Sequence, residues 1–386
     1  MRIILIIKED IKLFPPVSTL MRALLDEGNK VEVIGNWSDC VSKRRFEAEG
    51  VNFHNPGNYD VEGNLIGKLI NNIAFRRRVK SILYRLQLGR EPYRLWIFQG
   101  KTICLLHRLV KYHPCILHPL EFVDREIKLY YRLLSPLYNA ASTYGRAYRV
   151  VNCEYNRAHI LKGLLNLDEM PVVLPNKMLV DQKTLDFSAP EDIKEIACEV
   201  AESVRGKRVI LYQGIFVKGE RRLEEFCKAV MDLGPGYVMI IMGSSSQEGY
   251  RLLQKEYSGS NIIFVPFIAP PYHLLVTRLA HIGILTYFPR SESIATVINP
   301  LYCAPNKIFE YGMHGIPMIG NDIPGLYYIF REFECGKTVD YPMTKDKIKT
   351  AIEDIFSDYE TYSYGSRHYF ESVDVHEIVK TILKDE

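Results

Sequence analysis

The sequence lacks the short motifs that mark several large enzyme classes. No Asp-x-Asp pair and no Cys-x-x-Cys pair occurs, and His, Cys, Asp and Glu are nowhere grouped at metal-ligand spacing. A Walker phosphate-binding loop and a Gly-x-Ser-x-Gly nucleophile motif are also missing. These absences disfavour a metal-dependent transferase, a P-loop nucleotidase and a serine hydrolase.

Long apolar runs are missing as well. The apolar run at residues 3–7 is too short for a signal peptide and is typical of a buried parallel strand. No run approaches the length of a membrane-spanning helix. The eight cysteines are scattered among mostly apolar neighbours, which favours buried, reduced thiols and a cytosolic compartment.

Apolar, strand-like segments alternate with amphipathic segments along the chain, a pattern typical of a doubly wound α/β fold. A chain of 386 residues is too long for one ordinary core, so we expect two domains. Strands are expected at 3–7, 30–35, 95–99, 115–117, 149–151, 208–213, 237–243, 262–266, 282–287 and 317–320. Helices are expected at 18–27, 64–88, 121–138, 156–165, 222–233, 247–257, 272–279, after 344 and at 374–383.

This alternation restarts in the second half, which predicts two Rossmann-like domains with ligands at the carboxyl ends of their strands. We place the first domain at residues 1–180 and the second at 207–360. A polar region at 181–206 is expected to connect them and to include a leading helix. For the C-terminal helix in 361–386, a return to the first domain is left open.

The most informative stretch is residues 304–320, which predicts a short helix followed by an apolar strand. The helix opens after Pro305, and Gly315 suits the left-handed position just past its end. Lys307 and Glu310 share a face in the first turn, where the helix N-terminus attracts phosphates. A carboxylate there can also accept two ribose hydroxyls. The alternative is an ordinary amphipathic helix with a charged pair.

This stretch resembles the nucleotide-binding signature of GT-B glycosyltransferases of family 4, through Pro305, Asn306, Lys307, Glu310, Tyr311, Gly315 and Pro317. The resemblance implies a GT-B fold, with two Rossmann-like domains facing a central cleft. It also implies transfer of a sugar, with retention and without a metal or other cofactor. The donor would be a nucleotide-sugar, with a UDP-sugar as first choice, and the acceptor a saccharide or lipid-linked molecule in bacterial surface polysaccharide synthesis. Many relatives carry a further glutamate where this chain has Tyr302.

The resemblance also implies roles for individual residues. Glu310 would hold the ribose, while Arg221 and Lys307 would hold the diphosphate with help from backbone amides near Asn306. Arg221 is preferred for its distance from the following Leu-Glu pair, and Lys218 and Arg222 remain contenders. The other expected donor-binding residues are Gly214, Gly243, Phe267 and Ile268.

In the first domain, the main candidate is His118, which follows the expected strand 115–117. It would act as a general base or hydrogen-bond the reacting sugar. A structural histidine bonded to the backbone is an equally open interpretation. The weaker competitors are His107, His113 and Glu121.

Residues 68–94 carry eight cations and one acid, Glu91, with apolar residues interleaved. This pattern predicts a basic amphipathic helix that binds an anionic membrane surface, and therefore a protein peripheral to the cytoplasmic face of the cell membrane. The alternative is a helix packed on the sheet with a solvated basic face. No DNA- or RNA-binding fingerprint accompanies the segment, so a nucleic-acid partner is not expected.

Two other functions stay open on the sequence. One is a GT-B-fold nucleotide-sugar epimerase, which would convert a donor without an acceptor. The other is a non-catalytic protein that binds a nucleotide-sugar and scaffolds a polysaccharide-synthesising machine. The tyrosine at position 302 is the main support for the scaffold.

Overall fold

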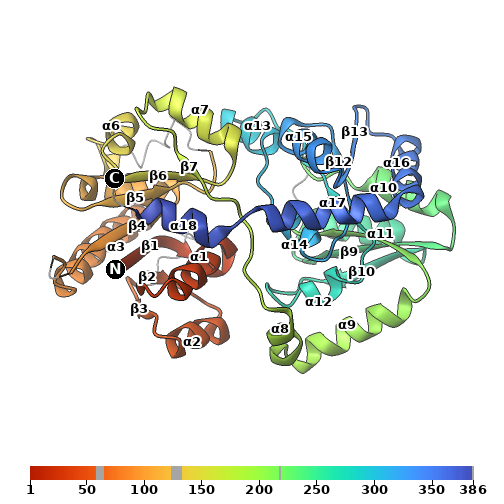
Figure 1. The fold of residues 1–386 in the computed structure, drawn as a ribbon, viewed down its shortest axis with the longest axis horizontal. Coiled ribbons are helices and arrows are strands. Elements are labelled where there is room, and N and C mark those ends of the chain that lie inside the picture. Colours follow the sequence, from red (N-terminus) through yellow and green to blue (C-terminus); the bar gives the residue numbers. More distant parts are fainter. Residues whose placement is uncertain (58–64, 90, 123–132, 217–218, 385–386) are drawn as a thin grey trace. The chain divides into compact units, whose positions relative to one another are not determined.

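The chain folds into two compact units, each built on one parallel sheet (Figure 1). The computed structural model describes residues 1–57, 65–89, 91–122, 133–216 and 219–384. Unit 1 consists of Met1–Asn176 and Asp374–Glu386, and unit 2 of Lys177–Val373.

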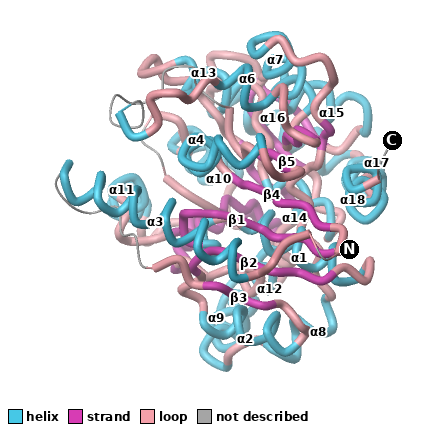
Figure 2. Tube along the Cα trace, turned by 90° about the vertical axis from the view of Figure 1, so that its left-hand side faces the viewer, coloured by secondary structure: helices cyan, strands magenta, loops and turns pink. Residues whose placement is uncertain are grey.

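The sheet of unit 1 has seven strands in the order β3-β2-β1-β4-β5-β6-β7. Figure 2 shows β3, β2, β1, β4 and β5 following one another across the sheet. The strand order reverses between β1 and β4, which lie side by side at the centre. The strands are β1 (Arg2–Asp10), β2 (Lys30–Asn36), β3 (Asn52–His54), β4 (Tyr93–Phe98), β5 (Cys115–His118), β6 (Arg149–Asn152) and β7 (Val172–Val173).

Helices cover the unit 1 sheet because alternate strand residues point to opposite faces and are apolar on both. Ile4, Ile6 and Leu95 share one core with Phe75 and Val79 of α3. The C-terminal helix α18 packs beside α1. The helices are η1 (Ile11–Leu13), α1 (Pro15–Asp26), α2 (Cys40–Ala48), α3 (Leu65–Arg85), α4 (Gly100–Leu106), η2 (His107–Lys111), α6 (Ala140–Tyr144), α7 (Tyr155–Leu165) and α18 (Val375–Leu383).

The sheet of unit 2 has six strands in the order β10-β9-β8-β11-β12-β13. Its strand order reverses between β8 and β11, which pair in parallel. In open α/β sheets, ligands bind at the carboxyl end of such a switch point. The strands are β8 (Arg208–Gln213), β9 (Tyr237–Gly243), β10 (Ile262–Pro266), β11 (Ile282–Leu285), β12 (Met318–Asn321) and β13 (Gly336–Val339).

Two separate cores fill the faces of the unit 2 sheet. Val209 and Leu211 of β8 belong to one core, and Ile210 and Tyr212 to the other, as the two-residue period of a strand requires. The first core includes side chains of α9, α12, α14 and α15, and the second includes side chains of α10, α11 and α16. The helices are α8 (Gln182–Ser188), α9 (Glu191–Ser203), α10 (Glu224–Leu233), α11 (Glu248–Tyr257), α12 (Leu274–Thr277), α13 (Ile294–Leu301), α14 (Asn306–Met313), α15 (Pro324–Phe333), α16 (Lys345–Ser357) and α17 (Tyr359–Ser372).

Most expected elements are present with small shifts of their ends, and three strands of unit 2 have the expected bounds. Most of the helix expected at 121–138 lies outside the described residues. The polar region 181–206 forms α8 and α9, which belong to unit 2. The C-terminal helix expected in 361–386 is two helices in the structure, α17 and α18, and the Tyr, Ser and Gly residues of α17 have weak helix propensity. Packing stabilises it, since the Tyr369 ring stacks on Phe309 and the Ser366 hydroxyl donates to the Ile316 carbonyl at 2.7 Å.

Helix α3 confirms a helix in the basic segment but also explains its apolar residues. Phe75, Val79, Ile82 and Leu83 are buried in the unit 1 core, so they are not free to enter a membrane. The expected alternative, a helix packed on the sheet with a solvated basic face, therefore describes this side of α3. In the part of the chain that the structure describes, no helix has both the length and the apolar character needed to cross a bilayer.

Gly283 of β11 provides a test of the packing beneath the switch point. A Cβ atom at this position would lie 2.4 Å from the ring of Tyr311, which is fully buried. We expect Gly283→Ala to lower the free energy of unfolding by about 1–3 kcal/mol, because the neighbouring core has no room to shift. Thermal unfolding measures the effect. Gly236→Ala is the matched control because a Cβ there meets nothing within 4 Å, and an equal loss in both variants would contradict the packing.

Candidate functional site

Polar and charged side chains meet at the carboxyl ends of β8 and β11 in unit 2. Gln213 ends β8, Gly214 follows it, and Tyr287 lies just beyond β11. Helix α14 contributes Lys307 and Glu310 to the same place. The site therefore lies at the switch point of the unit 2 sheet.

Lys307 is the cationic centre of this site. Its Nζ atom lies 4.5 Å from the centroid of the Tyr212 ring and 5.3 Å from that of Tyr287. Gly214, with φ +128°, leaves space beside it, since a Cβ there would lie 3.4 Å from Nζ. Burial, together with the charge of Arg221, lowers the pKa of Lys307 to about 7 despite the opposing effect of Glu310. Among the described residues no carboxylate forms an ion pair with Lys307.

Arg221 brings a second cation to the same ring. Its guanidinium carbon lies 4.2 Å from the centroid of Tyr287, and its Nη1 donates to Oε1 of Glu220 at 2.5 Å. Glu220 also lies 3.6 Å from Nε of Arg290. Two cations thus flank Tyr287, and of the two only Arg221 has a carboxylate partner among the described residues.

The other contenders for the role of Arg221 are placed differently. Arg222 is exposed, and its guanidinium lies 4.5 Å from the centroid of the Phe288 ring. Its Nε donates to the carbonyl of Gly219 at 3.4 Å. Lys218 lies outside the described residues. Of the two arginines, Arg221 is the one that shares an aromatic ring with Lys307.

Glu310 is a buried carboxylate with both oxygens engaged. Gln213 donates from Nε2 to Oε2 at 2.6 Å, and Nε2 of His273 lies 3.3 Å from Oε1. Burial alone would raise the pKa of Glu310, but His273, Gln213 and Lys307 outweigh it and hold the pKa below its usual value. The carboxylate is therefore ionised at neutral pH.

Helix α14 begins at the site, and its first backbone amides receive no side-chain cap. Its N-cap is Pro305, which offers no side-chain cap, so the amides of Asn306 and Lys307 have no acceptor within the helix. Gly315 follows the helix with φ +62°, which confirms the left-handed position expected for it. The N-terminus adds a partial positive charge beside the two cations.

The remaining expected donor-site residues lie at neighbouring strand ends. Gly243 ends β9. The absence of a side chain there is explained by packing within the protein, because a Cβ atom would lie 2.2 Å from the Phe216 ring. Phe267 follows β10 and is 54% exposed, whereas Ile268 is buried. Tyr302, at the position of the missing glutamate, caps the C-terminus of α13.

His118 belongs to unit 1 and is buried at the end of β5. Trp96 donates from Nε1 to its Nδ1 at 3.3 Å, and its Nε2 has no partner among the described residues. Burial lowers the pKa of His118 to about 3, so the ring is neutral at pH 7. A ring with this pKa is a weak base, but its free nitrogen can still form a hydrogen bond.

The competitors of His118 have local partners or are exposed. Nδ1 of His107 lies 2.9 Å from the carbonyl of Cys104, and Nδ1 of His113 lies 2.8 Å from the Tyr93 hydroxyl. Glu121 is exposed.

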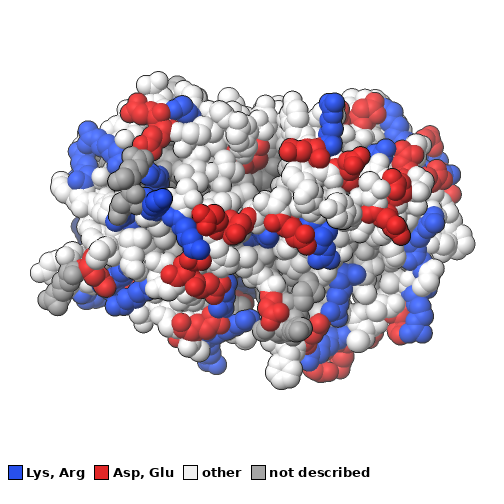
Figure 3. All heavy atoms as spheres, viewed as in Figure 1, with Lys and Arg blue, Asp and Glu red and all other residues white. Residues whose placement is uncertain are grey.

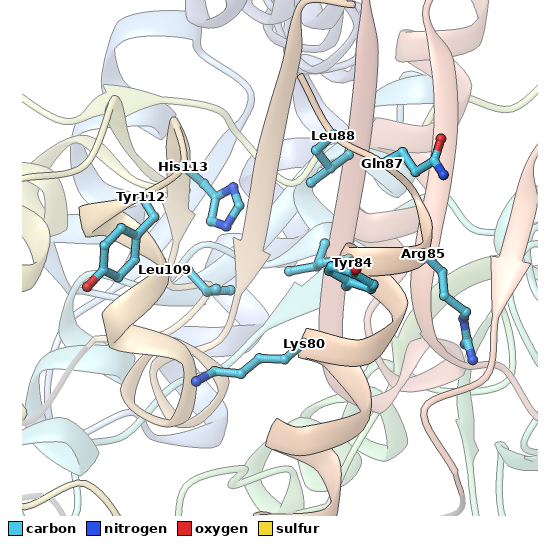
Figure 4. A pocket seen from close by; sticks show the side chains of 9 residues that line it. Lys80, Tyr84, Arg85, Gln87, Leu88, Leu109, Tyr112 and His113 are labelled. Carbon is cyan, nitrogen blue, oxygen red and sulfur yellow. The ribbon is translucent and has the colours of Figure 1, made fainter. Parts of the chain in front are cut away.

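His113 also lines an open pocket of about 760 Å³ at the C-terminal end of α3 (Figure 4). Leu83, Leu88 and Leu109 form its apolar part, and Lys80 and Tyr112 extend along one side. The pocket contains none of the expected site residues except the competitor His113.

Sequence reasoning missed three residues of the network around Glu310. Gln213 and His273 contact its carboxylate, and Thr277 donates to Gln213; none of them was an expected site residue. No spacing links them to Glu310, because β8, α12 and α14 meet only in the folded sheet. The available signal was the expected doubly wound fold, which places the carboxyl ends of its parallel strands at one edge of the sheet.

Comparisons with family models and with curated proteins found no match for this chain. Solved structures are similar. A glycosyltransferase from Rickettsia africae is 14% identical with a TM-score of 0.68, over 100% of this chain and 99% of that one. HepE of Anabaena, in complex with UDP and glucose, is 12% identical with a TM-score of 0.66, over 99% and 98%. WaaG, a glycosyltransferase involved in lipopolysaccharide biosynthesis, is 12% identical with a TM-score of 0.62, over 100% of both chains. The likeness confirms the expected GT-B fold.

The lowered pKa of Lys307 gives a prediction on stability. Unfolded lysine keeps its proton to about pH 10.5, whereas Lys307 in the native state loses it near pH 7. The unfolded state therefore binds more protons between these values, and wild-type stability rises with pH there. We expect Lys307→Met to raise Tm above that of the wild type, most at pH 6 and least at pH 9. The rise should be about 2–4 °C for each kcal/mol by which the free energy of unfolding increases.

Differential scanning fluorimetry across this pH range measures the effect. Lys255→Met, at an exposed position of α11, is the matched control and should leave Tm nearly unchanged at every pH. A lower Tm for Lys307→Met at pH 6 would contradict an uncompensated cation at this position.

Proposed function

We propose that this protein is a GT-B glycosyltransferase that moves a sugar from a nucleotide-sugar donor to a saccharide or lipid-linked acceptor. The observation that carries the proposal is Lys307, which has no ion-pair partner among the described residues and lies near Arg221 at the start of α14. A diphosphate would supply the missing negative charge.

The two cations account for the chemistry of the leaving group. When the glycosidic bond to the donor breaks, negative charge develops on the departing diphosphate. Lys307, Arg221 and the amides of Asn306 and Lys307 would stabilise this charge, and they are already in place before the reaction. With this neutralisation supplied by the protein, we propose that the transfer uses no metal or other cofactor.

Glu310 would bind the ribose of the donor. Each carboxylate oxygen can accept a second hydrogen bond besides the one it receives from Gln213 or His273. Two ribose hydroxyls could therefore donate to the ionised carboxylate. Phe267, exposed just beyond β10, offers an aromatic face for the base.

A UDP-sugar is the proposed donor, since the similar HepE structures contain UDP and UDP-glucose. We further propose retention of the anomeric configuration and a role in surface polysaccharide synthesis. The family resemblance at residues 304–320 supports both, and the likeness to WaaG supports the role. His118 would hydrogen-bond the reacting sugar instead of acting as a base, because burial lowers its pKa to about 3.

We also propose peripheral binding to the cytoplasmic face of an anionic membrane through α3. Arg77, Lys80 and Arg85 are exposed there, together with the apolar side chains of Ile70 and Tyr84. Each cation near such a surface contributes about 1 kcal/mol. The face drawn in Figure 3 carries both signs of charge over each unit, so no field of a single sign covers that face.

A non-catalytic nucleotide-sugar-binding scaffold is the second candidate. Tyr302 favours it, because the position lacks the carboxylate that many family members carry. Such a protein would bind the donor without turning it over, whereas a nucleotide-sugar epimerase would convert the donor without an acceptor.

The donor site is tested with UDP on the wild type, Glu310→Gln and Glu353→Gln. UDP should raise the wild-type Tm by mass action, since a ligand at 100 times its Kd stabilises by about 2.7 kcal/mol. Glu310→Gln should lose most of this shift because it removes the ionised acceptor. Glu353→Gln makes the same chemical change at an exposed position of α16 and should keep the shift.

The same three proteins are then incubated with UDP-sugars and a panel of acceptors, and UDP release is measured. Release that depends on acceptor supports transfer. Binding without release across the panel would favour the scaffold, and no UDP shift in a folded wild-type protein would contradict the donor site.

Membrane binding is tested by flotation with anionic and neutral liposomes. We expect the triple variant Arg77→Glu, Lys80→Glu, Arg85→Glu to bind anionic liposomes at least about tenfold more weakly, since three cations are reversed. Arg76 and Arg78 are left intact because they donate to the carbonyls of Leu134 and Pro56. Arg205→Glu with Lys255→Glu, both exposed in unit 2, is the control, and equal binding of all three proteins would contradict this surface.

A further inference from the structure

The carboxylate of Glu310 is held by a chain of buried side chains from separate elements. Gln213 ends β8, His273 precedes α12, and Thr277 ends that helix. None of these four side chains is more than about a tenth exposed: Glu310 is 5%, His273 6%, Gln213 3% and Thr277 0%. A buried polar network with fixed partners orients its members.

The directions of the hydrogen bonds among these four side chains follow from the ionised Glu310 carboxylate, which can only accept. The hydroxyl of Thr277 donates to Oε1 of Gln213 at 2.7 Å, with the His273 carbonyl 3.1 Å away. The amide oxygen of Gln213 therefore faces Thr277, and its NH₂ group faces Glu310. This contact fixes one oxygen of the carboxylate, Oε2.

His273 fixes the other oxygen, Oε1. An ionised carboxylate only accepts hydrogen bonds, so the proton between His273 and Glu310 lies on Nε2 of the ring. The opposite nitrogen, Nδ1, is buried and has no partner in the described part of the chain. The polar contact of the His273 ring in this structure is therefore with Glu310.

We infer that His273 is a positioning residue for nucleotide recognition. By donating to Oε1, it holds the plane of the Glu310 carboxylate so that both oxygens face the ribose hydroxyls of the donor. His273 would thereby set how strongly the site prefers ribonucleotides over nucleotides without these hydroxyls. The inference rests on the proposed function, in which Glu310 receives the ribose.

A purely structural role for His273 predicts something different. If the ring only fills space between α12 and α14, its loss weakens the binding of every nucleotide by a similar factor. If the ring positions the carboxylate, its loss weakens the binding only of ligands that carry the ribose hydroxyls. The ratio of two dissociation constants therefore separates the two roles, whatever happens to stability.

The experiment measures Kd by titration calorimetry for UDP and for 2′,3′-dideoxy-UDP. We expect the wild type to prefer UDP by at least about tenfold, as hydrogen bonds to a charged group imply. His273→Leu should bind UDP about tenfold more weakly and 2′,3′-dideoxy-UDP unchanged, so that the preference is lost. His273→Gln, whose side-chain amide can donate to Oε1, should restore most of the preference.

Val276→Ala is the structural control, since Val276 is fully buried in α12 but lies outside the network. It should lower Tm while keeping the preference for UDP. If His273→Leu does not fold, Thr277→Val provides a second measurement, because it releases the amide oxygen of Gln213 and should reduce the preference in part.

An unchanged preference in His273→Leu, or in Thr277→Val where the first variant does not fold, would overturn the inference and leave the donor site intact. A wild type that binds UDP and 2′,3′-dideoxy-UDP equally would overturn the ribose contact together with the role of His273. A wild type that binds neither would contradict the proposed function itself.

Discussion

The placement of a positive charge at Lys307 is the constraint on which the candidate site depends. An ammonium group inside a protein is costly unless an opposite charge accompanies it, and here it lies between two phenol rings. The rings offer some cation–π attraction, and Gly214 leaves open space beside the nitrogen. The result is a buried lysine with a pKa of about 7, whose charged form a bound anion would stabilise.

The neighbouring charges show how the protein keeps that cation available. Glu220 pairs with Arg221 and approaches Arg290. Glu310 is held by Gln213 and His273, and does not form an ion pair with Lys307 in the described structure. Each carboxylate near the site is therefore engaged by another group. This arrangement maintains the ionised state of Glu310, and no carboxylate in the described part of the chain is ion-paired with Lys307.

The two units differ in how clearly they present a function. Unit 2 gathers its polar residues at one switch point, where strand ends and the start of α14 meet. Unit 1 offers a buried, neutral His118 and a basic helix whose apolar side belongs to the core. The family resemblance shows the same difference, because its motifs lie in the second half of the chain, which forms unit 2. Recognition of a diphosphate and a ribose needs particular side chains, whereas an acceptor or a membrane can be recognised by many surfaces.

The sequence by itself determined the α/β class, the two-domain division, most strand positions and the grouping of Lys307 with Glu310 on one helical face. These properties depend on apolar periods and on residues close in the chain, which composition and spacing record directly. Tertiary structure alone decided that Arg221 rather than Arg222 shares a ring with Lys307, that α3 buries its apolar side, and that Gln213, Thr277 and His273 hold Glu310. Such contacts join residues far apart in the chain, and they form because strand order, which no local pattern encodes, brings β8, α12 and α14 to one edge of the sheet.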